Sequence, residues 1–154
     1  MRLLINLITI LSVLLLPLTA TAQPLLGADD TVLTGSAKSL VDSISAQTGL
    51  NSTQSAAGAA ALLALAKQHL QADYFADITD NAPGLSQLLA GGAGGIKFGS
   101  LYRLTSRDDA LAELRSLGLN SQNLNQLAMA VTGFLQQKGV NQRTLDTLKG
   151  LWLA

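Results

Sequence analysis

The residue best suited to chemistry in this chain is its single histidine, His69. Imidazole titrates near neutral pH, so a histidine can serve as a general base or a metal ligand. If one helix ran through this region, His69, Asp73 and Asp77 would stack one turn apart and could together hold a metal ion. Asp73 fits better as the N-cap of a new short helix, which would turn its face away from His69. We therefore expect no metal ligand here.

Nucleophilic catalysis of the Ser-His-Asp type would also have to use His69. Serines and aspartates are plentiful, but the Gly-x-Ser-x-Gly turn that presents a nucleophilic serine does not occur in the sequence. The chain has no cysteine for thiol catalysis or thiolate metal sites. The sequence therefore predicts no catalytic residue and a non-enzymatic protein. A hydrolase of cell wall or lipid that uses His69 is the weakest alternative.

Two other patterns resemble ligand sites without matching them. The glycines of "GGAGG" at 91–95 are followed by no Gly-Lys-Ser/Thr, so a hinge is the better interpretation than a phosphate loop. The acidic pairs lack the alternate spacing and closing Glu of a calcium loop; they are Asp29-Asp30, Asp77 with Asp80, and Asp108-Asp109. Paired carboxylates of the glycosidase type are not decided by sequence, although Glu113 falls on a regular helix. We expect no cofactor.

The first 22 residues have the layout of a secretory signal peptide. Met1-Arg2 gives a positive start, Leu3–Leu16 is mostly apolar, and Ala20-Thr21-Ala22 offers a small-x-small cleavage site. The apolar run is shorter than the roughly 20 residues of a membrane-spanning helix, so an anchor is the weaker alternative. We expect cleavage after Ala22 and export to the periplasm or the medium, with no transmembrane span in the mature chain.

The mature chain, residues 23–154, has a length that suits one domain. Lysine plus arginine equals aspartate plus glutamate, at 10 each, so there is no basic footprint for nucleic acid or anionic lipid. Aromatic residues are only 4%, which argues against a sugar-binding surface. Alanine and leucine abound and β-branched residues are few, which favours helices.

The apolar spacing predicts an all-α domain of about six short helices at 36–154, after a flexible segment at 23–35. Ser36 is the expected N-cap of a first helix, which ends at Gly49. The expected N-cap of a second helix, which reaches about Leu70, is Asn51, Ser52 or Thr53. That second helix is small or apolar on most faces, which is typical of a central helix. Each of the other helices has one apolar stripe; the stripes are Ala37, Leu40, Val41 and Ile44, then Leu111, Leu114 and Leu117, then Leu124, Leu127, Ala128, Val131, Phe134 and Leu135, and finally Leu145, Leu148 and Trp152.

Capping residues mark the later helices. Asp73 should open a short helix with Phe75 and Ile78 inward, and "LSQLLA" after Pro83-Gly84 should form another turn or two. Ser106 with Asp109 resembles a capping box. Ser121 and Asn141 are the expected caps of the last two helices, and Gly118 and Gly139 the stops before them. The segment 96–104 is ambiguous, and we expect helix or irregular structure there.

The tetrapeptide "GLNS" stands at 49–52 and again at 118–121. Each copy falls between two predicted helices, where Gly would end the first, Leu would pack under the corner and Asn-Ser would open the second. The copies indicate either convergence on one kind of corner or an old duplication of a helix-corner-helix unit. Under both interpretations the motif is structural.

Residues 51–89 resemble the VcgC/VcgE family, exported bacterial proteins classed as a domain of unknown function. The resemblance rests on the small-residue run 56–61, "LLALAK" at 62–67, the Asp73-x-Phe75 step with Ile78, and Pro83-Gly84 before Leu88-Leu89. The stretch "LGLNSQNL…FLQQKG" at 117–139 is similar to the family's second half, whereas 96–104 departs from it. The resemblance implies a small, helical, exported protein with no established activity, and it brings no catalytic residue.

The leading hypothesis is a non-enzymatic exported protein that binds a partner protein in the bacterial envelope. A carrier of a small apolar, lipid-like ligand between the helices is the alternative. The partner or ligand is not identified by the sequence.

Overall fold

The computed structural model describes residues 33–90 and 103–153. Within these ranges it contains seven helices and no strand, as a single compact domain, which confirms the predicted fold class. The helices are α1 (Gly35–Thr48), α2 (Ser52–His69), α3 (Ala72–Asn81), α4 (Ser86–Ala90), α6 (Arg107–Arg115), α7 (Ser121–Gln137) and α8 (Gln142–Leu153). The predicted signal peptide at 1–22, the hinge at 91–95 and most of 96–104 lie outside the described residues.

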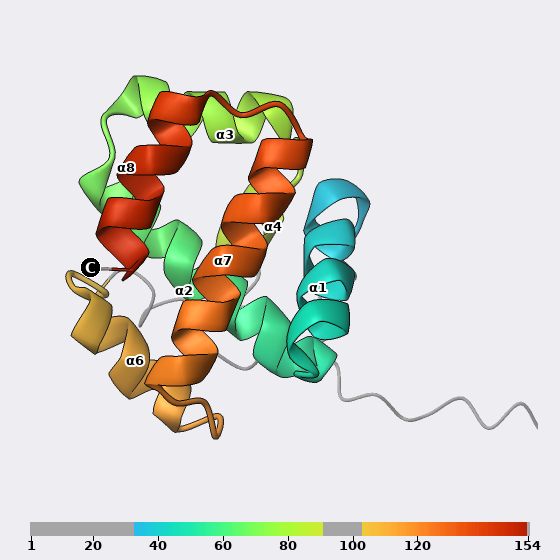
Figure 1. Ribbon diagram of the computed structural model, residues 1–154, viewed down its shortest axis with the longest axis vertical. Helices are drawn as coiled ribbons and strands as arrows, with labels where there is room; N and C mark the ends of the chain where they lie inside the picture. The colour runs from blue at the N-terminus through green and yellow to red at the C-terminus, as the bar shows by residue number, and fades with distance from the viewer. Residues whose placement is uncertain (1–32, 91–102, 154) are drawn as a thin grey trace, which may run out of the picture.

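Helix α2 is the centre of the fold, as its composition predicts. Every residue from Ser55 to Ala66 is buried, because α1, α3, α4, α6, α7 and α8 all contact this helix. The run of alanines lets these neighbours approach closely, since a methyl side chain keeps helix axes near one another. Figure 1 shows α2 passing behind a front layer in which α7 stands between α8 and α1. Helix α3 crosses one end of this layer, and α6 lies at the other.

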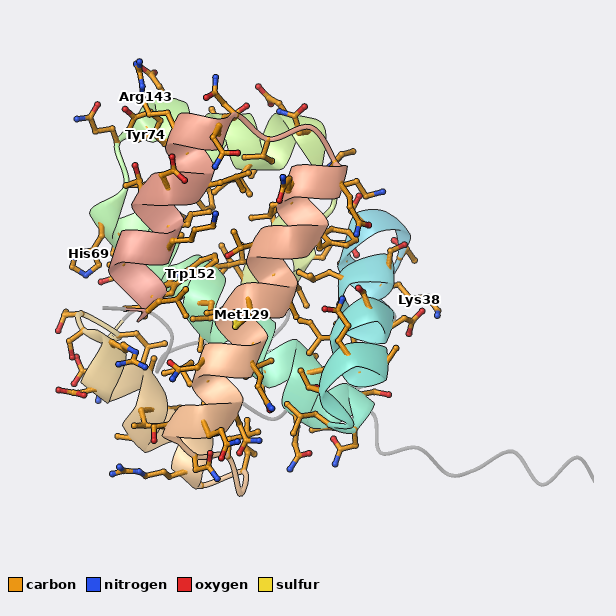
Figure 2. The ribbon with its side chains drawn as sticks, viewed as in Figure 1. Lys38, His69, Tyr74, Met129, Arg143 and Trp152 are labelled. Carbon is orange, nitrogen blue, oxygen red and sulfur yellow. The ribbon has the colours of Figure 1, made fainter. Side chains whose placement is uncertain are left out.

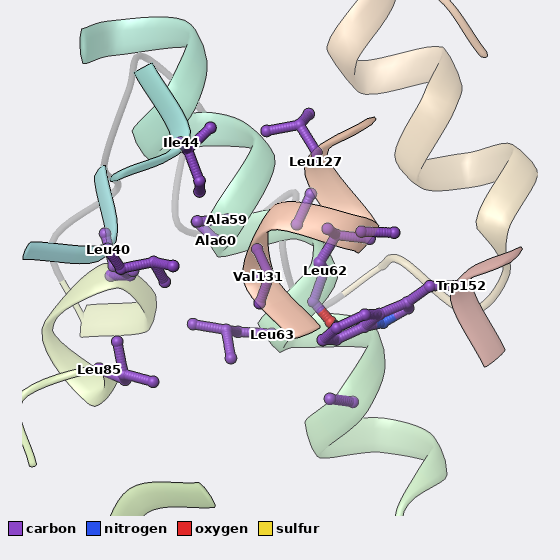
Figure 3. Packing of buried hydrophobic residues seen from close by; sticks show 14 of the residues in the cluster. Leu40, Ile44, Ala59, Ala60, Leu62, Leu63, Leu85, Leu127, Val131 and Trp152 are labelled. Atoms are coloured by element: carbon purple, nitrogen blue, oxygen red, sulfur yellow. The ribbon is translucent and has the colours of Figure 1, made fainter. Parts of the chain in front are cut away.

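The core is built from the predicted stripes. All four apolar residues of the α1 stripe and all six of the α7 stripe are buried. Of the predicted stripe Leu111, Leu114 and Leu117, only Leu114 is fully buried. Figure 3 shows Leu40 and Ile44 of α1, Leu62 and Leu63 of α2 and Val131 of α7 converging in one cluster. Trp152 of α8 belongs to the same core cluster, and its side chain is 0% exposed. Its indole Nε1 donates to the backbone oxygen of Leu62 at 3.1 Å.

The structure moves three of the predicted caps by one or two residues. Thr34, not Ser36, is the N-cap of α1, and its side chain makes no capping bond. Gln71, not Asp73, precedes α3, so Asp73 lies in the first turn, where its charge suits the positive helix start. Asn120, not Ser121, caps α7. The Ser106–Asp109 box and the Asn141 cap are confirmed.

Both "GLNS" copies are helix corners, as predicted. Gly49 and Gly118 have left-handed backbone angles (φ 72° and 80°), which a residue without Cβ adopts at little cost. Asn51 and Asn120 each complete a capping box with the residue three positions on. The two corners also meet: Gln54 Nε2, from the first box, donates to the backbone oxygen of Leu117 at 2.9 Å. The two halves of the chain are therefore joined at their equivalent corners.

Candidate functional site

His69 links the end of α2 to the start of α6 through a hydrogen bond. Its Nε2 lies 2.7 Å from the backbone oxygen of Thr105. A carbonyl oxygen can only accept, so Nε2 carries the proton and donates. Nε2 is therefore engaged in a structural contact. Figure 2 shows His69 at the edge of the molecule, at the end of α2.

Next to this contact, Asp109 organises the N-terminus of α6. Its Oδ2 accepts from the hydroxyl and the amide of Thr105, at 2.8 and 3.1 Å, and from the amide of Ser106 at 3.0 Å. The amide of Asp109 in turn donates to Ser106 Oγ at 3.1 Å. Hydrogen bonds from the Thr105 hydroxyl, from Ser106 and from the Thr105 amide hold the pKa of this carboxyl below its ordinary value of 3.8.

The fold thus brings a Ser, a His and an Asp together, but not in the roles of a catalytic triad. In a triad the histidine accepts from the serine and donates to the carboxylate. Here His69 donates to a backbone oxygen, Ser106 Oγ accepts from an amide, and Asp109 accepts from backbone groups and a threonine. These hydrogen bonds join the end of α2 to the start of α6. Their role is structural.

The other candidate residues from the sequence are separated from His69. The chain leaves α2 after His69 and begins α3 at Ala72, so the single helix that would align His69, Asp73 and Asp77 does not form. Within the described ranges, no three His, Cys, Asp or Glu side chains gather closely enough to hold a metal ion. Glu113 lies half-buried on α6.

Asp77 ties α3 to the start of α8. Its Oδ2 accepts from the amide of Asn141 at 2.9 Å and from the hydroxyl of Thr144 at 2.8 Å, and its Oδ1 accepts from Asn81 Nδ2 at 2.8 Å. A carboxylate is favoured at this place, because the first amides of α8 have no partner within the helix. The role of Asp77 is therefore to anchor a helix terminus.

The outward face of α7 is the strongest candidate for a functional surface. We define this face by seven residues of α7 that lie away from the core, of which Gly133 is half-buried and the others are exposed: Gln122, Asn125, Gln126, Met129, Gly133, Gln136 and Gln137. The whole helix, Ser121–Gln137, has no charged residue. Met129 is 66% exposed, the highest value among the large hydrophobic side chains that the structure describes. Figure 2 shows Met129 midway along α7, in the front layer between α8 and α1.

A glycine lies one turn further along the same face. A Cβ built on Gly133 would have no atom within 4 Å, so neither Met129 nor the glutamines cover this position. Long side chains on a helix point toward its N-terminus, which directs Met129 away from Gly133. The outward face therefore carries an apolar projection beside an open position.

Sequence reasoning identified the buried stripe of α7 and missed its outward face. The signal was present in the sequence, because a helix of this length with no charged residue is unusual for a solvated surface. Exposed methionine is over-represented at binding surfaces, since its flexible side chain adapts to different partners. A search for uncharged exposed stripes, besides apolar ones, would have found it.

The comparisons with known proteins place the chain in a family. Among the described residues, no helix is both long enough and apolar enough to cross a membrane. No curated protein and no solved structure matches the chain. The family model described as "Protein of unknown function VcgC/VcgE (DUF2780)" matches residues 19–149, which includes the helices from α1 to α7 and most of α8. The chain therefore belongs to the VcgC/VcgE family of proteins of unknown function.

Proposed function

We propose that this is a non-enzymatic exported protein that acts by binding another protein through the outward face of α7. The observation that carries the proposal is Met129, two-thirds exposed at the centre of a helix without charge. Burying such a side chain at an interface contributes roughly 1.5–3 kcal/mol. The surrounding amides can donate and accept across an interface without the desolvation cost of charged groups.

Two further observations support parts of this proposal. The layout of residues 1–22 supports export to the periplasm or the medium. The engagement of His69 with Thr105 supports a role without catalysis, because the one histidine of the chain already has a structural partner.

The test is photo-crosslinking and capture in native envelope extract, with a photoreactive residue at Gln126, beside Met129. Three forms are compared: the mature chain, a Met129→Glu variant, and an Ala76→Glu variant that places the same charge at an exposed apolar residue of α3. We expect a discrete protein crosslink for the mature chain and for Ala76→Glu, and its loss for Met129→Glu.

Three results would contradict the proposal. Equal crosslinking by the Met129→Glu and Ala76→Glu variants would show that the outward face is not the binding surface. Lipid that copurifies with all three forms, with no protein crosslink, would favour the carrier of an apolar ligand instead. A screened hydrolytic activity that disappears in His69→Ala would support an enzyme.

A further inference from the structure

We propose that Met129 is a reversible oxidation site, at which a peroxide or hypochlorous acid converts the thioether to the sulfoxide and makes the outward face of α7 polar while the fold stays intact. The proposal is carried by the exposure of this side chain and by its sulfur, which is the single sulfur of the mature chain. The consequence for binding rests on the proposed function, because that binding uses Met129.

The sulfur of the mature chain is confined to one side chain. The sequence has two methionines and no cysteine, and Met1 lies in the predicted signal peptide. Thiols and thioethers are the side-chain groups that mild oxidants attack most readily. Trp152, the single tryptophan, is 0% exposed and so is shielded by the core. An oxidant in solution therefore meets one preferred target, the Sδ atom of Met129.

The position of Met129 separates oxidation from unfolding. Its side chain is 66% exposed, whereas its neighbours Ala128 and Ala130 belong to the core cluster. Figure 2 shows Met129 on α7 in the front layer, between α8 and α1. An oxygen added to a buried methionine disrupts the packing around it. Here the added oxygen would enter solvent, so the buried stripe of α7 keeps its contacts.

The neighbouring amides suit the oxidised form. A long side chain on a helix is directed toward the N-terminus, which places Met129 over Asn125 and Gln126, one turn earlier. Arg107 Nη2 donates to Asn125 Oδ1, so the amide nitrogen of Asn125 remains as a donor. A sulfoxide oxygen accepts hydrogen bonds far better than a thioether sulfur does. The oxidised side chain is therefore within reach of donors on its own helix.

The chemistry balances with one oxidant molecule. A lone pair of Met129 Sδ attacks one oxygen of hydrogen peroxide, the S–O bond forms and the O–O bond breaks. The second oxygen leaves as hydroxide and takes the proton of the transferred oxygen, which gives water. Sulfur loses the two electrons that the peroxide gains. A methionine sulfoxide reductase reverses the change: two of its thiols become a disulfide, and the oxygen leaves as water.

The test of the site is oxidation of the mature chain with hydrogen peroxide, followed by mass spectrometry and peptide mapping. We expect the addition of one oxygen, about 16 Da, at Met129, at a rate within about tenfold of that of free methionine. Circular dichroism and the emission of Trp152 should stay unchanged. Methionine sulfoxide reductases for both epimers should restore the original mass.

The matched control moves the thioether into the core of the same helix. In a Met129→Leu background, Leu127→Met places a methionine at a position that is 0% exposed, with little change in volume. This methionine should oxidise at least about tenfold more slowly than Met129. Equal rates at the two positions, or a loss of helical signal when Met129 is oxidised, would overturn the proposal.

The consequence for binding is measured with the photoreactive residue at Gln126. The chain is oxidised, freed of oxidant and then mixed with native envelope extract. We expect the protein crosslink to fall at least about tenfold and to return after treatment with the reductases, which act on the sulfoxide alone. Undiminished crosslinking by the oxidised chain would overturn control of binding by oxidation and leave the binding function standing. If no crosslink depends on Met129 at all, the binding function fails, and the mass measurement decides the oxidation site by itself.

Discussion

Thr105 is held from two sides, and this explains what the single histidine does. His69 donates to its backbone oxygen, while Asp109 accepts from its amide and hydroxyl. The residue types that suggested catalysis are thus the types that fasten a helix start, because both tasks need short polar groups with fixed donors and acceptors. Residue type alone does not separate the two, whereas the direction of each hydrogen bond does.

The lowered pKa of Asp109 predicts an acid-dependent contribution to stability. A carboxyl whose folded pKa lies below its unfolded pKa stabilises the fold above the unfolded value, and this contribution is lost as the pH falls through the folded pKa. Asp109→Asn should therefore lower the melting temperature at pH 7, and the difference from wild type should shrink as the pH falls below about 4.

The matched control for this prediction is Asp108→Asn. Asp108 lies in the same first turn of α6, so its substitution removes the same charge from the helix start without touching the bonds to Thr105 and Ser106. Thermal melts of both variants at pH 7 and pH 2.5 separate the two effects. An equal response of both variants would mean that only the helix dipole is involved.

At the scale of elements, periodicity predicted which face of each helix is buried, but not which helix covers it. The α1 and α7 stripes were assigned residue by residue, because 3.6-residue spacing determines a face. Nothing in the spacing shows that α1 packs against α7. Asn120 caps α7 in place of Ser121 because adjacent Asn and Ser residues are nearly equivalent candidates locally. Thr34 and Gln71 make no side-chain capping bond, so capping residues do not determine where α1 and α3 begin.

The contact between α2 and α7 predicts opposite effects for two glycine substitutions. A Cβ on Gly58 would lie 2.5 Å from Leu127 Cδ1, in a fully buried position. Gly58→Ala gains about 1 kcal/mol of helix propensity but overpacks the contact at a cost of roughly 1–3 kcal/mol, so we expect a net loss of stability.

Gly133→Ala is the counterpart on α7. Its Cβ meets nothing within 4 Å, so only the propensity gain of about 0.5–1 kcal/mol should appear. Urea unfolding of both variants gives the two signs. Stabilisation by both would mean that Leu127 moves aside freely and that the helix contact is loosely packed.

In the whole molecule, the helices of one corner pack against the helices of the other corner. The first helix of each corner packs against the second helix of the other, α1 on α7 and α6 on α2. Gly58 contacts Leu127, and these positions are 69 residues apart, the same interval that separates Gly49 from Gly118. Contact between equivalent positions is what a local twofold axis produces. Duplication of a helix-corner-helix unit stays a prediction, and such a duplication would produce this arrangement.

The bond between the two corners predicts a measurable coupling of the halves. Gln54 and Asn123 hold the same position in their capping boxes, but only the amide of Gln54 also reaches Leu117. Gln54→Ala and Asn123→Ala should each lose the side-chain bond back to the N-cap amide, at about 0.5–1 kcal/mol. Gln54→Ala should lose about a further 1 kcal/mol for the link between corners. Equal losses in chemical denaturation would show that the link contributes nothing.

The position of Trp152 has a consequence for observing this protein. It is the single tryptophan of the chain, fully buried where α8 docks on α2, with its indole N–H bonded to Leu62. Its ultraviolet emission is therefore an intrinsic optical signal for the seating of the last helix, blue-shifted while α8 is docked and red-shifted once water reaches the ring. The fluorescence of Trp152 therefore reports, without an added label, whether α8 is packed on the core.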